Sequence, residues 1–194
     1  PRPLPADPDQ HSDSSRKKDT LILEERIAHH VRMAEAYRDA YLRQGVQDGE
    51  AFADAWKFAE DGVYVSPYFT GDQVFKFSEF PEDTARASTM EAKAYSLSFP
   101  DWKPAGFDYW PADNGLVMKT RWEGHTEAGV KMGFYSYSFI ETNEAGELIR
   151  WETHVNDEYN AFLDVALGVH GPFHGTGEYL DALERTLAAA GVTV

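Results

Sequence analysis

Apolar residues recur at helical spacing through the first part of the chain. From Leu21 to Leu42 they fall every three or four positions, which predicts a first helix. The segment GVQDGE interrupts this pattern before a second predicted helix through Trp56 and Ala59. A strand, GVYVSPYF, follows, and EDTARASTMEAKAYSLSF predicts a third helix that PDWKPAG ends. The first half is therefore predicted to be mainly helical.

The second half changes to alternation of apolar and polar positions. Four strand-like segments, FDYWPAD, GLVMKTRWEGH, VKMGFYSYSFIET and ELIRWETHV, are separated by turn signals at Asn114-Gly115, Ala128-Gly129 and Ala145-Gly146. A short helix over 157–167, a loop GVHGPFHGTG and a last amphipathic helix complete the chain. Helices followed by an antiparallel meander predict an α+β fold in which a curved sheet and N-terminal helices enclose a conical pocket.

Composition separates the chain into two parts. Residues 1–20 are rich in Pro, Asp and Ser, which predicts a flexible arm that buries too little apolar surface to order itself. Residues 21–194 fit one domain with a C-terminal helix, since a chain of 194 residues with 42% hydrophobic residues can bury one sizeable core.

The net charge and the absence of cysteine exclude some classes of binding partner and of catalysis. A net charge of −15 disfavours nucleic acid and anionic membranes as partners. Because the chain has no cysteine, disulfides, thiolate catalysis and cysteine metal clusters are excluded. No apolar run approaches the roughly 20 residues of a membrane span, and the N-terminal segment lacks the apolar core of a signal peptide, so we expect a cytoplasmic protein.

Turn lengths predict which side chains share a face of the sheet. A four-residue turn would pair His125 with Val130, and a two-residue turn would pair Glu144 with Glu147. One face would then carry Arg121, His125, Phe134, Ser136, Ser138, Trp151, Thr153 and Asp157. The opposite face would carry Met118, Trp122, Tyr135, Tyr137, Phe139, Arg150, Glu152 and His154. A single bulge would exchange these groupings, so the face that lines the pocket stays open.

The first of these faces offers acid/base chemistry. A carboxylate and an imidazole on one pocket wall can divide proton abstraction from proton donation, and an arginine can stabilise developing negative charge. Asp157, His125 and Arg121 have these properties. The alternative is that they form a solvated polar face, and His154 is open to the same two interpretations.

Four segments resemble, in order and spacing, the SnoaL-like family, within the fold shared by nuclear transport factor two, ketosteroid isomerase and scytalone dehydratase. They are FAEDGVYVSPYF after two helices, SFPDW closing the third, TRWEGHTEAG on a middle strand and NEAGELIRWETHVNDEYNAFL on the last, between His30 and Gly168. The resemblance implies a functional histidine at His125 and an acid/base aspartate at Asp157. Trp151 lies further ahead of Asp157 than in the usual pattern, which leaves His154 as the alternative inward residue.

The resemblance also bears on other positions. Ser66 stands where ketosteroid isomerase-like proteins carry their base, which disfavours that mechanism. The first-helix tyrosine of those proteins corresponds to Tyr37, which would donate a hydrogen bond to an oxyanion. Candidates for an apolar pocket that suits an aromatic substrate are Trp56, Tyr64, Tyr68, Tyr95, Phe99, Trp102, Phe134 and Trp151, each of which could instead be ordinary core.

No cofactor or metal is expected. The chain lacks a glycine-rich phosphate loop, and His170 and His174 stand in a Gly/Pro setting with no carboxylate motif after them. We therefore interpret the HGPFHG segment as a loop at the mouth of the pocket.

The leading hypothesis is cofactor-independent acid/base catalysis on a hydrophobic aromatic molecule. The chain is similar to diarylpropane formaldehyde lyases, which implies release of formaldehyde from a lignin-derived dimer to give a stilbene. In that interpretation His125 or His154 protonates the leaving hydroxyl, Asp157 acts as base or orients the histidine, and Tyr37 or Arg121 stabilises the phenolate. Alternatives are a polyketide cyclase, dehydratase or isomerase, and a non-catalytic small-molecule-binding domain. An uncovered sheet face predicts a homodimer.

Overall fold

The computed structural model describes residues 22–44, 55–66, 69–70, 74–76 and 83–193. Its elements, in chain order, are α1 (Leu23–Gln44), β1 (Phe58–Val65), β2 (Phe69–Thr70), β3 (Val74–Lys76), α3 (Asp83–Ser98), β4 (Lys103–Ala112), β5 (Gly115–His125), β6 (Lys131–Thr142), β7 (Leu148–Val155), α4 (Glu158–Ala166), β8 (Phe173–His174) and α5 (Gly175–Ala189). The arm predicted at 1–20, the GVQDGE segment and Tyr68 lie outside the described residues.

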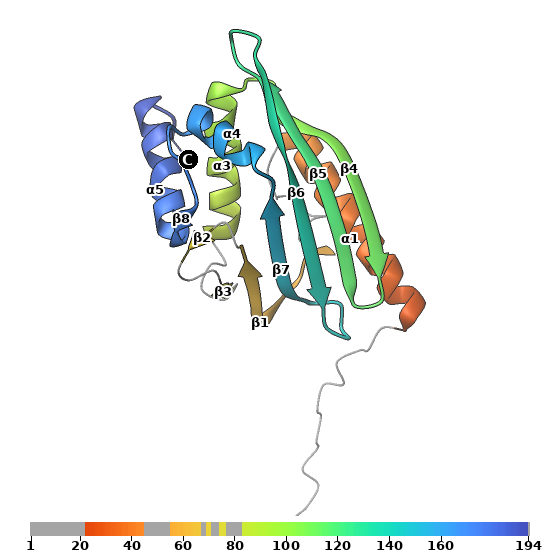
Figure 1. The fold of residues 1–194 in the computed structure, drawn as a ribbon. Coiled ribbons are helices and arrows are strands. Elements are labelled where there is room, and N and C mark those ends of the chain that lie inside the picture. Colours follow the sequence, from red (N-terminus) through yellow and green to blue (C-terminus); the bar gives the residue numbers. More distant parts are fainter. Residues whose placement is uncertain (1–21, 45–54, 67–68, 71–73, 77–82, 194) are drawn as a thin grey trace, which may run out of the picture.

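A curved, mainly antiparallel sheet organises the described part of the chain. Its strand order is β3-β1-β7-β6-β5-β4, and only β1 and β7 run parallel, while β2 and β8 form a separate short pair. Helix α1 lies across one face of β4 and β5, and α3, α4 and α5 gather at the other end of the sheet (Figure 1). The predicted α+β fold with a curved antiparallel sheet is confirmed.

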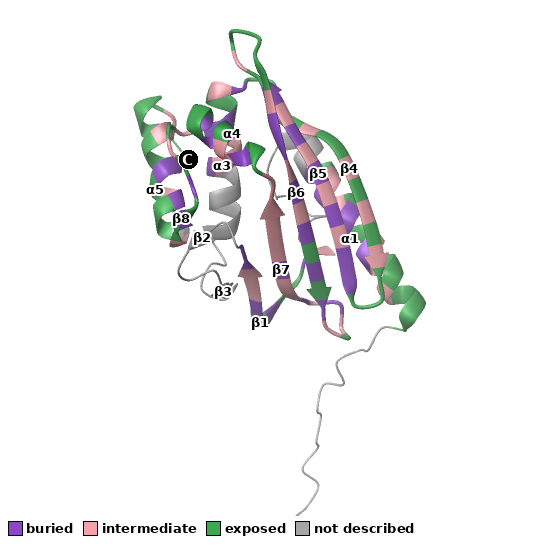
Figure 2. Ribbon diagram, in the orientation of Figure 1, coloured by how far each residue is buried: buried purple, intermediate pink, exposed green. Residues whose placement is uncertain are grey.

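The meander follows the predicted segments closely. Strand β5 covers the predicted GLVMKTRWEGH segment, and buried positions alternate along β5 and β6 (Figure 2). Gly129 and Gly146 occupy the turns with φ of 78°, a left-handed conformation that glycine adopts without the steric cost of a Cβ. The alternation of one buried and one more exposed side makes this sheet a two-faced layer.

Three boundaries differ from the prediction. The second helix was predicted through Ala59, but β1 already begins at Phe58, which pairs with Leu148 of β7. Strand β4 begins at Lys103, inside the segment predicted to end a helix, because that segment pairs with β5. The predicted mouth loop contains β8 and the start of α5 at Gly175. In each case pairing with a distant segment outweighs the local signal.

The β5–β6 turn corrects the predicted faces. His125 pairs with Lys131 and not with Val130, because Thr126 and Val130 close a tighter turn: Thr126 N–H donates to the Val130 carbonyl over 3.0 Å. This shift of one residue reverses the parity across the hairpin. Arg121 therefore lies opposite Tyr135, and the prediction that Arg121 and His125 share a face with Phe134 is wrong.

The other half of the face prediction is confirmed. Ser138 pairs with Thr153, and Ser136 with Val155, so the predicted grouping of these β6 and β7 positions holds. The inner face, turned toward α1 and α3, carries Phe107, Met118, Thr120, Trp122, Phe134, Ser136, Ser138, Trp151 and Thr153. The outer face carries Arg121, His125, Tyr135, Tyr137, Phe139, Arg150, Glu152 and His154.

Aromatic packing joins the helices to the inner face. The Phe162 ring of α4 lies 4.8 Å from that of Phe99, 4.5 Å from that of Trp102 and 5.2 Å from that of Phe134. Phe162 is fully buried. Such a side chain contributes most of its stabilisation through the apolar area that it removes from water. The helices are therefore fixed against one end of the inner face.

Candidate functional site

Hydroxyl groups interrupt the apolar inner face of the sheet. Thr120, Ser136 and Ser138 are buried on β5 and β6. Ser136 Oγ accepts a hydrogen bond from Trp122 Nε1 over 2.8 Å, and the Ser138 and Thr153 hydroxyls lie 3.1 Å apart. Buried hydroxyls cost free energy unless they are hydrogen-bonded, so these contacts make a polar strip possible within the core.

Tyr64 extends this strip onto β1. Its register partner is Trp151, so its side chain lies on the inner face, with the two rings 6.0 Å apart. Burial raises the pKa of the Tyr64 phenol to about 12, although hydrogen bonds with Thr153 and Ser66 act in the opposite direction. The phenol therefore remains protonated over the physiological range and serves as a neutral hydrogen-bond donor.

A carboxyl group, Glu91, approaches the same region from α3. Burial raises the pKa of Glu91, and the hydrogen bond that the Tyr179 hydroxyl donates to its Oε2, over 2.6 Å, opposes that rise. The negative charge of Glu91 also contributes to the raised pKa of Tyr64, after burial, which makes the largest contribution. The Glu91 side chain is still partly exposed, whereas Tyr179 is buried.

Further tyrosines continue from Glu91 into the core. The Tyr179 hydroxyl of α5 lies 2.7 Å from that of Tyr95, which lies 3.0 Å from that of Tyr159 at the start of α4. Glu91 and Tyr95 are four residues apart on α3, so they project from the same side of the helix. Burial raises the pKa values of Tyr95 and Tyr179 well above the usual range. We call Tyr64, Glu91, Tyr95, Tyr159 and Tyr179 the Glu91–tyrosine cluster.

The cluster has the properties of a proton-transfer site. A carboxyl with a raised pKa can hold a proton at a higher pH than an exposed one and can therefore act as acid and then as base. Neutral phenols in a low-dielectric interior stabilise a developing oxyanion more strongly than they would in water. Hydrogen bonds join the Glu91 carboxyl, Tyr179, Tyr95 and Tyr159, so a proton-carrying group and neutral phenols occur within one network.

Aromatic rings adjoin this network on both sides. Trp151 packs 4.8 Å from Trp56 and 6.1 Å from Tyr37, measured between ring centroids. The Trp56 indole N–H donates to the Met33 carbonyl over 2.9 Å, whereas Trp151 Nε1 is buried without a hydrogen-bond partner among the described residues. On the other side, Tyr95 lies in edge contact with Phe162. The predicted aromatic residues that the structure describes are thus buried or partly buried.

The predicted pocket residues fall into two groups there. One group, near α1, contains Trp56, Tyr64 and Trp151, and ring contacts link it to Tyr37, which was predicted as an oxyanion donor. The other, near α4, contains Tyr95, Phe99, Trp102 and Phe134, which meet around Phe162. Since the second group is closely packed, it is the core of the domain, and the first group is the better candidate for substrate contact.

The predicted acid/base residues take different positions. His125 Nδ1 lies 2.8 Å from Asp101 Oδ2, and not beside Asp157, which precedes α4. Arg121 donates to Glu158 over 2.5 Å, and its guanidinium lies 4.8 Å from the centroid of the Tyr135 ring. Arg121 and His125 lie on the outer face, whereas Asp157 follows β7 as the N-cap of α4. The expected coupling of His125 with Asp157 across one pocket wall is therefore not observed.

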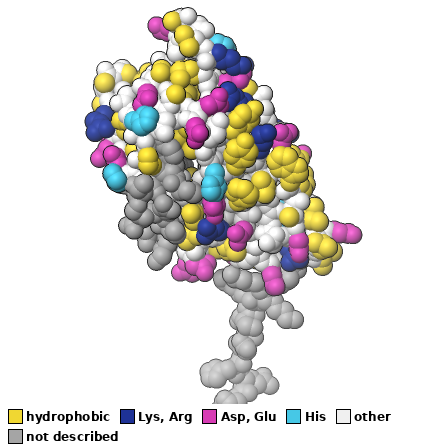
Figure 3. All heavy atoms as spheres, viewed as in Figure 1, with side chains coloured by type: hydrophobic (Ala, Val, Ile, Leu, Met, Phe, Trp, Pro, Cys, Tyr) yellow, Lys and Arg dark blue, Asp and Glu magenta, His cyan; other side chains and the backbone are white. Residues whose placement is uncertain are grey.

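His154, the alternative, is also on the outer face. Its Nε2 lies 2.7 Å from Glu152 Oε1, and Arg150 donates to the same carboxylate over 2.6 Å. These hydrogen bonds lower the pKa of Glu152, with that of Arg150 making the larger contribution. Figure 3 shows histidines, charged groups and hydrophobic side chains intermixed over this face. Ion pairs of this exposed kind contribute little to stability.

Sequence reasoning missed Glu91, Tyr159 and Tyr179. The signal for Glu91 was its spacing of four residues from Tyr95 on the predicted third helix, which places a carboxylate on the apolar side of that helix. No comparable signal pointed to Tyr179, because its partner lies 88 positions away in the chain.

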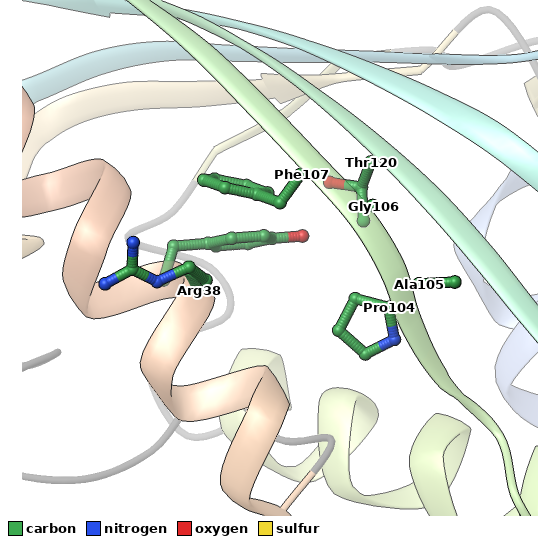
Figure 4. Close-up of a pocket in the computed structure, with 7 residues that line it drawn as sticks. Arg38, Pro104, Ala105, Gly106, Phe107 and Thr120 are labelled. Carbon is green, nitrogen blue, oxygen red and sulfur yellow. The ribbon is translucent and has the colours of Figure 1, made fainter.

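A cavity of about 240 Å³ opens between α1 and β4, beside Tyr37 (Figure 4). Its other lining residues are Arg38, Pro104, Ala105, Gly106, Phe107 and Thr120. Within the described ranges there is no group of three or more His, Asp or Glu side chains placed to hold a metal ion. None of the helices described has the length and apolar character needed to cross a membrane.

Comparisons with known proteins give similarities of structure but none of sequence. The chain matches no protein-family profile and no curated protein sequence. It is similar to Bal32a from a soil-derived mobile gene cassette, with 16% identity and a TM-score of 0.42 over 68% of this chain and 94% of the other. A protein from a Jannaschia species, named as a SnoaL-like polyketide cyclase, is 11% identical with a TM-score of 0.45 over 76% and 96% of the two chains. An NTF2-like protein from Burkholderia thailandensis is 12% identical with a TM-score of 0.44 over 66% and 90%. SnoaL-like and NTF2-like proteins are thus among the solved structures that this chain resembles.

Proposed function

We propose that this protein is a cofactor-independent acid/base catalyst that acts on a hydrophobic aromatic molecule bound against the inner face of the sheet. Glu91 carries the proton, and Tyr64 donates a hydrogen bond to the oxygen on which negative charge develops. The observation that supports this most is the 2.6 Å hydrogen bond that the Tyr179 hydroxyl donates to Glu91, within a chain of tyrosine hydroxyls, at a carboxyl whose pKa is raised by burial.

The pKa values suit these roles. General acid/base catalysis is most efficient when the pKa of the catalytic group lies near the working pH, and burial moves Glu91 in that direction. Tyr64, with a pKa of about 12, keeps its proton and remains a donor while the substrate oxygen becomes negative. Tyr179 holds the Glu91 carboxylate in place through its hydrogen bond.

The surroundings favour an aromatic substrate. Tyr64 contacts Trp151, which in turn contacts Trp56 and Tyr37, so rings adjoin the Tyr64 side of the cluster. Flat apolar rings next to a few convergent polar groups are typical of small-molecule sites. The unpartnered Trp151 indole N–H adds a donor that an oxygen of the substrate would satisfy.

Within this class we propose, as the narrower reaction, release of formaldehyde from a phenolic diarylpropane. Protonated Glu91 gives its proton to the benzylic hydroxyl, which leaves as water while the substrate phenol loses its proton to solvent, and a quinone methide forms. Glu91, now a carboxylate, removes the proton of the terminal alcohol. The carbon–carbon bond breaks, formaldehyde departs, and the electron pair returns to the ring to give a phenolate stilbene. Tyr64 donates to the developing phenolate.

The same groups would serve a polyketide cyclase, a dehydratase or an isomerase, in each of which a carboxylate removes a proton beside a carbonyl or hydroxyl group. A non-catalytic domain would bind the molecule and return it unchanged. Loss of formaldehyde and water, or of water alone, identifies the lyase or the dehydratase by product mass. Isomerisation and ring closure without dehydration leave the mass unchanged, so a product of the same mass with a different chromatographic retention time distinguishes them from simple binding.

The test is incubation of the protein with a panel of phenolic diaryl compounds and polyketide precursors, followed by mass spectrometry. We expect turnover with at least one compound, survival of that turnover after EDTA and dialysis, and a loss of roughly a hundredfold or more in Glu91→Gln. Glu158→Gln is the matched control, because Glu158 is exposed and paired with Arg121. Full activity in Glu91→Gln would contradict the proposal.

A further inference from the structure

The cavity lies between α1 and β4, and Tyr37 forms part of its lining. In Figure 4, Arg38 and the Phe107 ring stand toward one end, and Pro104 and Ala105 stand at the other. Tyr37 and Phe107 are stacked, with ring centroids 5.9 Å apart and an interplanar angle of 23°. The walls are therefore flat and largely apolar, which suits a planar ring.

The backbone of β4 is irregular at this point. Pro104 pairs with Trp122 and Gly106 with Arg121, so Ala105 is an extra residue in the ladder, a β-bulge. Pro104 has no N–H to contribute to the sheet. Bulges occur preferentially at strand edges and next to functional sites, where they change the direction of a side chain. Here the bulge forms the wall of the cavity that faces α1.

Arg38 brings a guanidinium group to the cavity, and Asp39 is its ion-pair partner at one nitrogen. The Nε–H of Arg38 donates to Asp39 Oδ1 over 3.0 Å, and its two terminal amino groups have no hydrogen-bond partner among the described residues. Because the whole chain carries a net charge of −15, an anion would be held near it only by such a local cation. The planar guanidinium matches the two oxygens of a carboxylate.

Thr120 places a hydroxyl at the same cavity. Its side chain is buried, so an oxygen of a ligand that reached it would exchange a hydrogen bond out of contact with water. The volume of about 240 Å³ lies below the roughly 300–1,000 Å³ of pockets that take drug-sized ligands. The space therefore suits one ring with small substituents.

We propose that this cavity is a binding site for a single-ring aromatic carboxylate. The ring lies against Phe107 and Pro104, the carboxylate pairs with the terminal amino groups of Arg38, and a ring hydroxyl reaches Thr120. The site adjoins the proposed substrate region, with which it shares Tyr37 and Thr120, but none of its lining residues belongs to the Glu91–tyrosine cluster, and ligand binding there does not depend on the catalysis proposed for that cluster.

The test is equilibrium binding of 4-hydroxybenzoate, followed by calorimetry and by amide chemical shifts. We compare it with 4-hydroxybenzyl alcohol, which keeps the ring without the charge, and with cyclohexanecarboxylate, which keeps the charge without the aromatic ring. We expect 4-hydroxybenzoate to bind about tenfold or more tightly than either, with the largest shifts at Ala105 and Gly106. Equal binding of the acid and the alcohol would overturn the proposal.

Variants locate the interaction. Arg38→Gln should lose about tenfold in affinity for 4-hydroxybenzoate and no longer distinguish it from the alcohol, whereas Arg38→Lys should retain part of the preference. Arg32→Gln, an exposed arginine on the same helix, is the matched control and should bind as wild type does. Glu91→Gln should also bind normally, which separates this site from the catalytic one. Wild-type affinity in Arg38→Gln, or shifts centred on Tyr64, would contradict the assignment.

Discussion

The two faces of the sheet carry carboxylates in opposite electrostatic settings. On the outer face, Glu152 and Glu158 are paired with arginines, and hydrogen bonds lower the pKa of each: that of Glu152 chiefly through Arg150, that of Glu158 chiefly through Asn156 and then Arg121. On the inner side, the hydrogen-bond partner of Glu91 is a neutral tyrosine, and burial raises its pKa. For these three glutamates, the direction of the pKa shift therefore depends on the surroundings of the side chain.

This contrast bears directly on function. A carboxylate whose charge is neutralised by an exposed cation is stabilised in its ionised form and is a weak base. A carboxyl whose pKa is raised, next to neutral phenols, holds its proton to a higher pH than an exposed carboxyl does and can act as acid and then as base. Acid/base catalysis is consequently expected from the inner side, and each prediction below tests the difference between the two settings.

The largest difference concerns stability on the two sides of α4. Phe162 faces the inner sheet and is fully buried, whereas Val165 on the same helix is 44% exposed. Phe162→Ala should lower the free energy of unfolding by about 3–5 kcal/mol, because it removes apolar contacts and leaves a cavity. Val165→Ala should change it by about 0.5 kcal/mol or less. Urea denaturation measures both, and similar losses would show that α4 does not pack as described.

The second prediction compares the inner carboxyl with the acid/base residues expected from sequence. Glu91→Gln should reduce turnover roughly a hundredfold or more, while His125→Phe and Asp157→Asn should each remain within about threefold of wild type. The reason is that His125 pairs with Asp101 on the outer side, away from the Glu91–tyrosine cluster. Initial rates on a substrate from the panel decide the matter. Large losses of turnover in His125→Phe and Asp157→Asn, with little loss in Glu91→Gln, would show that the active site contains His125 and Asp157 and not Glu91.

The third prediction concerns what covers the outer face. Trp110, Val117 and Phe139 are register partners across β4, β5 and β6, and Trp110 and Phe139 are 54% and 45% exposed. We infer that this row is the contact of a homodimer, since exposed apolar groups on a sheet are stabilised by a second copy. Phe139→Lys should weaken association about tenfold or more in sedimentation experiments. Leu97→Lys, at an exposed apolar position on α3, is the control. A wild-type protein that is monomeric at micromolar concentration would contradict this.

The smallest effect is a pH dependence of stability from His30. Burial lowers the pKa of His30 below its ordinary value of 6.5, against the opposing effect of its hydrogen bond to the Ala112 carbonyl. The unfolded chain therefore binds a proton more readily, so stability is complete above about pH 6.5 and falls as the pH drops below it. Urea midpoints at several pH values measure this, and His30→Gln should reduce the slope. An unchanged slope in the variant would assign the effect to other groups.

Local sequence patterns predicted the elements of the meander, because alternation and glycine turns are properties of neighbouring residues. They could not fix the parity across the β5–β6 hairpin, which depended on the hydrogen bonds by which Thr126 and Val130 close the turn. That one-residue difference placed Arg121 and His125 on the opposite face. A face assignment from sequence is only as certain as the turn that sets it.

The candidate site was less predictable than the fold. Tyr64 and Trp151 were expected in the pocket and lie on the inner face. Glu91 and Tyr179 were not found, because a buried carboxyl and its phenol partner come from two helices that the sequence separates widely. Packing between residues distant in the sequence creates the environment that raises the pKa of Glu91, so local sequence patterns could not predict it.

The most direct test of the contrast between the two faces is a carbon-detected NMR titration of the carboxyl groups of Glu91, Glu152 and Glu158. It needs no substrate and reports each pKa separately. The account predicts that Glu91 titrates above the ordinary value of 4.5 and that Glu152 and Glu158 titrate below it. In Tyr179→Phe the pKa of Glu91 should rise further, because the hydrogen bond that favours its ionised form is lost. A Glu91 that titrated at or below 4.5, together with the outer-face carboxylates, would contradict the claim that the inner side holds the proton-transfer group.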